Sequence, residues 1–183
     1  TLPYRLTEQV PNVATSWGRA NDTTLEITIS QDVHWEDQAP SNGRQLTLDD
    51  VLFSYNRGYF LPTSPRAVVS GPEDAPTSIE AIGPWSVRIT SLPKAFPRVS
   101  AHAFDYLNIW PKDAVELYGD LNDWRNNVGT GPYTITDVVP GNSYILSRVT
   151  NYWRQQPLYP EDTIPYPDGV RILVIPDLST KFA

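Results

Sequence analysis

The sequence contains no cysteine and no methionine. The lack of cysteine excludes disulfide bonds, thiolate metal ligands and a cysteine nucleophile. It does not assign a redox compartment, because a cysteine-free protein suits either side of a membrane. The first residue is Thr1 and not methionine, so we expect a segment to precede it.

Long apolar runs and basic clusters are also lacking. No stretch approaches the roughly 18 apolar residues of a transmembrane helix, so the sequence predicts no membrane span. Lys and Arg number 14 against 21 Asp and Glu, which gives a net charge of −7. Binding to a nucleic-acid backbone is therefore not expected, because that contact needs clustered positive charge.

Motifs for catalysis or metal binding are sparse. The two histidines, His34 and His102, stand far from each other and outside any metal-ligand spacing. The acidic pairs Glu36-Asp37 and Asp49-Asp50 could be offered as glycosidase carboxylates, but adjacent acids point in different directions. Asp49 and Asp50 are better explained as first-turn charges of a helix. The sequence thus predicts no enzyme, no cofactor and no metal site.

The chain does have enough apolar residues to fold. Its 183 residues are 40% hydrophobic and 19% charged, which is typical of a globular domain, and we expect residues 1–183 to form a single domain. It has 18 prolines, many of them beside aromatic residues. This composition favours short strands joined by stiff loops.

Alternating apolar and polar residues predict most of the strands. A strand over 25–30 follows the turn Asn21-Asp22, and Trp17 lies on the strand before that turn. Further strands are expected at 78–82, 86–90, 133–139, 144–149 and 170–175, with an extended lead-in over 1–11. The continuous apolar character of 170–175 indicates a strand more buried than the others.

Three helices are expected between these strands. The first covers 47–59, with Thr47 and Asp50 close to a capping box, an apolar face at helical spacing, and an end at Gly58. Short helical segments are predicted at 98–104 and from Pro111 to Tyr118. The loops 38–45 and 61–77 lie on either side of the first helix. Together these elements predict an α+β fold with a mostly antiparallel sheet.

Several blocks of aromatic and turn residues recur in a definite order. They are Trp17, Val33-His34-Trp35-Glu36-Asp37, the segment 46–55, Ile109-Trp110-Pro111-Lys112, Gly129-Thr130-Gly131-Pro132-Tyr133, Asn151-Tyr152-Trp153, and the segment 170–177. In their order and spacing these blocks resemble the substrate-binding proteins of peptide, oligopeptide and nickel ABC importers. The resemblance covers most of the chain from about residue 11, although the loop at 38–45 is larger than in that family.

The resemblance implies a fragment of the first lobe of a two-lobed, periplasmic-binding-protein-like fold. The implied protein is an extracytoplasmic monomer, either periplasmic or a lipoprotein anchored at the cell surface. It would bind a peptide or a similar small solute between its lobes and pass it to the membrane permease of an importer. In the oligopeptide binders the acidic group that captures the peptide's amino terminus lies elsewhere, so this chain does not identify the solute.

The resemblance also places candidate ligand contacts near the cleft. They are Tyr59 and Phe60 at the end of the first helix, and Phe104 and Tyr106 before Trp110. Aromatics in the hairpin motifs are expected to be core residues instead. They are Trp17, Trp35, Tyr133 and Trp153.

The Gly-Thr-Gly-Pro-Tyr turn is assigned to architecture, with Gly129 and Gly131 permitting positive φ or a close approach. Two other functions stay open. One is a self-contained β-rich module that recognises carbohydrate or another ligand through exposed coplanar tryptophans. The other is an enzyme with two carboxyls about 5–10 Å apart in a pocket.

Overall fold

The structure is a computed structural model that describes residues 11–64, 71–105 and 107–175. It divides the chain into two compact units. Unit 1 holds the described residues of Thr1–Gln31 and Leu46–Lys112, and unit 2 those of Asp32–Gln45 and Asp113–Ala183. Whether the two units together form the single domain that we expected stays a prediction.

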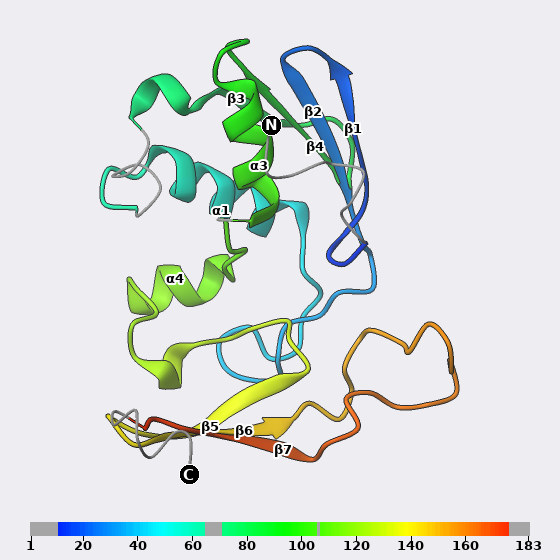
Figure 1. Cartoon of the computed structure of the whole chain (residues 1–183), viewed down its shortest axis with the longest axis vertical. Helices are drawn as coiled ribbons and strands as arrows, with labels where there is room; N and C mark the ends of the chain where they lie inside the picture. The colour runs from blue at the N-terminus through cyan, green and yellow to red at the C-terminus, as the bar shows by residue number, and fades with distance from the viewer. Residues whose placement is uncertain (1–10, 65–70, 106, 176–183) are drawn as a thin grey trace. The chain divides into compact units, whose positions relative to one another are not determined.

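Unit 1 is built on a four-stranded antiparallel sheet (Figure 1). The strands are β1 (Ala14–Asn21), β2 (Thr24–Ile29), β3 (Pro76–Ala81) and β4 (Ser86–Ser91), in the order β1-β2-β4-β3. The predicted turn joins β1 and β2. In this turn the Asn21 side chain accepts a hydrogen bond from the amide of Thr23. The predicted alternation is also confirmed, since Leu25, Ile27 and Ile29 are buried.

Two helices of unit 1 contribute buried residues to its core. They are α1 (Leu48–Phe60) and α3 (Phe96–Asp105), and a short 3₁₀ turn, η2, covers Pro72–Asp74. The capping interaction predicted for α1 is present, because both the amide and the hydroxyl of Thr47 donate to Asp50 Oδ2 at 3.0 Å.

The predicted bounds of the first helix, 47–59, are confirmed to within one residue, but α1 continues past Gly58 to Phe60, so Gly58 does not end it. A Cβ on Gly58 would lie 2.3 Å from Leu107 Cδ2. Gly58 therefore provides room for the close approach of Leu107 and does not act as a helix terminator.

Unit 2 contains a second antiparallel sheet, with three strands in the order β5-β6-β7. They are β5 (Tyr133–Val139), β6 (Ser143–Arg148) and β7 (Gly169–Leu173). The predicted hairpin is confirmed, and Gly141 in its turn has a φ of 72°, which favours glycine. The helix α4 (Lys112–Tyr118) begins at the last residue of unit 1 and continues in unit 2, and η3 (Trp124–Asn126) follows it.

The prediction that the last strand is the most buried is wrong. Every residue of β7 is exposed, including Val170, Ile172 and Leu173. A continuous apolar run is typical of a strand covered on both faces. Among the described residues, however, β7 pairs only with β6 and stands at the edge of its sheet.

The structure also contains the other helices and strands that the sequence predicts. The hairpin at 78–90 and the helical segments at 98–104 and after Pro111 are confirmed as β3-β4, α3 and α4. The extended lead-in lies outside the described residues apart from Pro11. None of the helices that the structure describes has the length and apolar character needed to cross a bilayer. The predicted fold class, α+β with antiparallel sheets, is confirmed.

Candidate ligand-contacting site

Two tyrosines join α1 to α3 within unit 1. The Tyr55 hydroxyl donates to the carbonyl of Ala103 at 2.9 Å, and the Tyr59 hydroxyl donates to the carbonyl of Val99 at 2.8 Å. Both pairs are spaced by four residues, so they follow one face of each helix. Burial raises the pKa of Tyr55, which keeps its hydroxyl protonated as a donor. These two bonds fix the end of α1 beside α3.

The predicted ligand contacts lie near this junction but differ in exposure. Tyr59 is only 2% exposed and its hydroxyl is used within the fold, whereas Phe60 is 48% exposed. The rings of Tyr59 and Phe60 lie 6.5 Å apart. Phe104 is half-buried and its ring lies 5.4 Å from that of Trp17 on β1. Tyr106 lies outside the described residues.

The structure therefore brings Tyr59 together with Phe60, and Phe104 together with Trp17. Phe60 and, in part, Phe104 are exposed, whereas Tyr59 is buried with its hydroxyl bonded to Val99. The role of all four predicted residues as ligand contacts stays a prediction. Local sequence alone does not reveal the burial of Tyr59, because it depends on the docking of α1 against α3.

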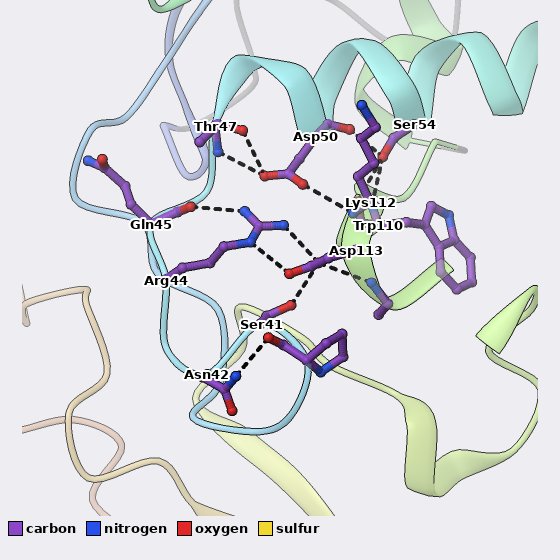
Figure 2. A network of polar contacts seen from close by, with 12 residues as sticks. Ser41, Asn42, Arg44, Gln45, Thr47, Asp50, Ser54, Trp110, Lys112 and Asp113 are labelled. Carbon is purple, nitrogen blue, oxygen red and sulfur yellow. Dashed lines mark hydrogen bonds and ion pairs between the residues drawn. The ribbon is translucent and has the colours of Figure 1, made fainter. Parts of the chain in front are cut away.

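The segment 110–112 is held against α1 by polar contacts (Figure 2). Ser54 Oγ accepts from the amide of Trp110 at 2.7 Å and donates to the carbonyl of Asp50 at 2.6 Å. Asp50 Oδ1 accepts from the amide of Lys112 at 3.1 Å. Asp50 is therefore more than the first-turn charge that the sequence predicts, because it is 1% exposed and also anchors residues 110–112. In the sequence this role is indicated only by the capping position of Asp50 and by Ser54 one helical turn later.

In unit 2 the Gly-Thr-Gly-Pro-Tyr turn is held by Glu36. The Glu36 amide donates to the carbonyl of Gly129 at 2.8 Å, and its carboxylate accepts from Thr134 Oγ1 at 2.7 Å. Burial raises the pKa of Glu36, although the hydrogen bonds from Thr134 and the Gly129 backbone oppose that rise. The indole of Trp153 donates to the carbonyl of Thr130 at 2.9 Å. These contacts support the architectural assignment of the turn.

Neither glycine of this turn adopts the positive φ that we considered, which corrects that interpretation. A Cβ on Gly129 would lie 3.0 Å from Glu36 Oε1, so the close approach applies to Gly129. A Cβ on Gly131 would meet nothing closer than 3.8 Å.

A hollow of about 270 Å³ lies on unit 1, away from Tyr59 and Phe60. Its lining is small and polar for the most part: Ser16, Trp17, Gly18, Arg19, Ala20, Glu26, Thr28, Ile82 and Ser86. Glu26 is paired with Arg88 at 2.8 Å, and the Thr28 and Ser86 hydroxyls bond to each other. Three polar side chains of this hollow, those of Glu26, Thr28 and Ser86, thus already have partners within the fold. Its lining includes none of the predicted ligand contacts, although Trp17, which was expected to be a core residue, packs on Phe104.

Within the described ranges, no group of three or more His, Cys, Asp or Glu side chains converges to hold a metal ion. Two of the four acids considered as glycosidase carboxylates, Glu36 and Asp50, have structural partners instead. Glu36 binds the turn at Gly129, and Asp50 binds the start of α1 and Lys112.

Comparison with known proteins assigns the chain to a family. Residues 8–183 match the model of the bacterial extracellular solute-binding proteins, family 5 Middle, and the chain belongs to this family. It is 30% identical to a protein of Brucella melitensis named only as a binding protein, over 70% of this chain and 20% of that protein. It is 29% identical to the nickel-binding protein NikA of Staphylococcus aureus, over 82% of this chain and 28% of that protein.

Among solved structures, the periplasmic binding protein DppA of Helicobacter pylori in complex with the peptide STSA superposes with a TM-score of 0.69. The identity is 25%, over 94% of this chain and 35% of DppA. The chain therefore has the fold of part of a two-lobed periplasmic binding protein. It spans about a fifth to a third of the proteins named here.

Proposed function

We propose that this chain is part of an extracytoplasmic solute-binding protein that delivers a peptide, or a similar small solute, to the permease of an ABC importer. The observation that carries the proposal is the family match over nearly the whole chain. The similarity to DppA, solved with a bound peptide, supports a peptide as the solute, and the similarity to NikA keeps nickel as the alternative. No catalytic role is included, because the relatives are binding proteins.

The ligand is proposed to contact Phe60, Phe104 and Tyr106, with Tyr59 holding Phe60 in place. Phe60 supports this because it is a large aromatic side chain, about half exposed, at the end of a helix that two buried tyrosine bonds fix in position. Rigid exposed aromatics contribute strongly to binding, because little side-chain entropy is lost when they are covered.

The first experiment is calorimetric titration of the 183-residue chain with di- to pentapeptides and with Ni²⁺. Solute-binding proteins of two lobes bind by closing both lobes on the ligand, so one lobe alone loses a large part of the contact. We expect a Kd of about 1 mM or weaker for the chain alone. A submicromolar Kd would contradict the proposal that the cleft needs residues outside this chain.

The second experiment uses the full-length gene product with Phe60→Ala. Loss of one aromatic contact should weaken peptide binding by about tenfold. The matched control is Leu117→Ala, since Leu117 is also apolar and exposed but lies on α4. If both variants bind like the parent, Phe60 is not a ligand contact. If the parent binds neither peptides nor Ni²⁺, the proposed solute class is wrong.

The alternative of a self-contained carbohydrate module loses its main support. That hypothesis required exposed, coplanar tryptophans on one sheet face. Trp35 is buried, Trp17 packs on Phe104, and the indole of Trp153 bonds within its own unit. None of the chain's tryptophans is fully exposed.

A further inference from the structure

Asn42 is the one asparagine of the chain that is followed by a glycine. An asparagine in this position can modify itself, because the backbone nitrogen of the next residue attacks its side-chain carbonyl carbon. Glycine makes that attack easiest, since it has no side chain to obstruct the approach and allows the backbone to rotate. Asn42 is also exposed, in the loop at 38–45. Sequence and exposure together mark Asn42 as a candidate for deamidation.

This deamidation needs no reactant other than water. A bond forms between the backbone nitrogen of Gly43 and Asn42 Cγ, the bond between Cγ and Nδ2 breaks, and Nδ2 leaves as ammonia with the proton of the Gly43 amide. Water then opens the cyclic imide. Attack of water at Cγ gives aspartate. Attack at the backbone carbonyl carbon gives isoaspartate, in which the main chain runs through the former side chain.

In the folded loop both reacting groups are engaged in hydrogen bonds. The Gly43 amide donates to the carbonyl of Glu36 at 3.1 Å, and Asn42 Nδ2 donates to the carbonyl of Pro40 at 2.8 Å. Asn42 and Gly43 have φ values of 44° and 71°, so both lie in the left-handed region of a tight turn. The imide can form only when this turn opens, because the Gly43 nitrogen must leave Glu36 to reach Asn42 Cγ.

The residues on either side of the turn hold it closed. Figure 2 shows Ser41 and Arg44 directed to the same carboxylate, that of Asp113. Ser41 is only 3% exposed, and the Arg44–Asp113 pair is partly buried and bidentate, which makes it stronger than a surface ion pair. Opening of the turn therefore requires that contacts with a residue far along the chain be broken.

We propose that Asn42 is a site of self-modification by deamidation, whose rate depends on the contacts of the loop at 38–45 with Asp113. While those contacts persist, the turn is closed and the reaction is slow. Each opening of the loop gives the Gly43 nitrogen access to Asn42 Cγ. Release of ammonia is not reversed when the loop closes again, so the modification is a permanent record of loop opening.

The products weaken the turn in which they form. Both carry a new negative charge, and Asp37 is already close, since its Oδ1 lies 3.8 Å from the position that a Cβ on Gly43 would take. Like charges at short distance repel. Isoaspartate also lengthens the main chain within the turn, which displaces the Gly43 amide from its acceptor. Opening therefore promotes modification, and modification promotes further opening.

The first test follows deamidation site by site in the full-length gene product, by peptide mapping with mass spectrometry at mildly alkaline pH. In concentrated urea, Asn42 should react faster than any other asparagine of these 183 residues, including Asn142, which precedes a serine. In the folded protein the rate at Asn42 should be at least about tenfold lower than in urea. A faster site elsewhere in urea, or equal rates at Asn42 in both states, would contradict the proposal.

The second test removes the restraint without changing the reacting residues. In urea Asp113→Ala should react at Asn42 at the rate of the parent, but in the folded protein it should react about tenfold faster. Asp168→Ala is the matched control, because Asp168 forms an ion pair of the same length, 2.8 Å, outside the loop. That variant should leave the rate at Asn42 unchanged.

Two further variants keep the second test decisive. Ser41→Ala removes one bond to Asp113 and should give a smaller rise at Asn42, even if Asp113→Ala does not fold. Ile27→Val lowers global stability from the buried sheet of unit 1 and should give no rise. An equal rise with Ile27→Val would assign the reaction to global unfolding, and no rise with Asp113→Ala or Ser41→Ala would exclude the loop contacts; either result overturns the proposal. Neither bears on solute binding, because no predicted ligand contact is changed.

Discussion

Arg44 donates two hydrogen bonds to the carboxylate of Asp113, which lies 69 positions further along the chain (Figure 2). Nε bonds Oδ2 at 2.9 Å and the terminal nitrogen bonds Oδ1 at 2.8 Å, which is the bidentate geometry of strong arginine–carboxylate pairs. Ser41 Oγ and the Ala114 amide also donate to Asp113, each at 3.0 Å. The carboxylate thus ties the loop at 38–45 to the start of α4.

The first prediction concerns the removal of this charge. Arg44, then Ser41 and the Ala114 amide, hold the pKa of Asp113 below its usual 3.8 against the opposing effect of burial. The stability that this carboxylate contributes is therefore present above pH 3.8 and is lost as the pH falls through the lower folded-state pKa. Asp113→Asn should reduce the free energy of unfolding by about 1–2 kcal/mol at pH 7, and the difference from the parent should shrink below pH 3.8.

Urea unfolding at pH 7 and at strongly acidic pH measures this difference. Asp123→Asn is the control, because Asp123 pairs only with nearby Arg125 and both are exposed. That variant should change stability by less than about 0.5 kcal/mol. A destabilisation by Asp113→Asn that is the same at both pH values would show that the ionised carboxylate is not the cause.

The second prediction concerns Glu36, whose pKa shifts in the opposite direction to that of Asp113. Burial raises its pKa above 4.5, so the folded state holds the proton more tightly than the unfolded state. The protonated form contributes stability below pH 4.5, and this contribution is lost as the pH rises through the folded-state pKa. Glu36→Gln keeps an acceptor for Thr134 without the charge. The stability of the parent should therefore fall relative to that of Glu36→Gln as the pH rises from 4.5.

The measurement is urea unfolding of parent and variant at several pH values from 4 upward. Asp37→Asn is the control, because Asp37 is adjacent but exposed. Its difference from the parent shows how much of the effect comes from removing a charge in this segment alone. A parent that gains stability relative to Glu36→Gln with rising pH would contradict the raised pKa.

Much of the fold could be predicted because its signals are local. The alternation in β2, the spacing of apolar residues in α1 and the turn at Gly141 each depend on neighbours in the sequence. The burial of a residue depends on what packs against it, and local patterns do not supply that information. The candidate site shows the same limit, since the burial of Tyr59 depends on the packing of α1 against α3, where its hydroxyl bonds the carbonyl of Val99.

The Gly-Thr-Gly-Pro-Tyr turn shows that the sequence position of a glycine does not reveal whether the fold requires glycine there. The sequence marks Gly129 and Gly131 equally, but only Gly129 lies close to another group, the carboxylate of Glu36. That partner is more than ninety positions earlier in the chain. The physical need for glycine is therefore created by a long-range contact.

The third prediction separates these two glycines. Gly129→Ala should push the Glu36 carboxylate from its bond with Thr134 and lower the free energy of unfolding by about 1 kcal/mol or more. Gly131→Ala should change it by less than about 0.5 kcal/mol, because a Cβ there has only ordinary contacts. Thermal and urea unfolding of both variants tests the contrast. Equal losses would show that the backbone conformation, and not Glu36, requires glycine in this turn.

The last prediction separates the neighbouring acids Asp49 and Asp50. Asp50 is 1% exposed and accepts hydrogen bonds from Thr47 and Lys112, whereas Asp49 is exposed on the first turn of α1. Asp50→Ala leaves the amides of both partners without this largely buried acceptor, and we expect a loss of about 3 kcal/mol in the free energy of unfolding. Asp49→Ala removes only a favourable helix-end charge, and we expect a loss below about 1 kcal/mol.

Urea unfolding measures both losses, and hydrogen exchange locates them. In Asp50→Ala the amide of Lys112 should exchange faster than that of Ile27 in β2, because it loses its acceptor directly whereas the sheet is affected only through global stability. Similar losses for the two alanine variants would mean that Asp50 acts as a helix-end charge, as its sequence position alone suggests. A larger loss for Asp50→Ala, with the Lys112 amide exposed first, would show that a residue chosen by local rules as a cap also anchors the segment 110–112 beside the proposed aromatic contacts.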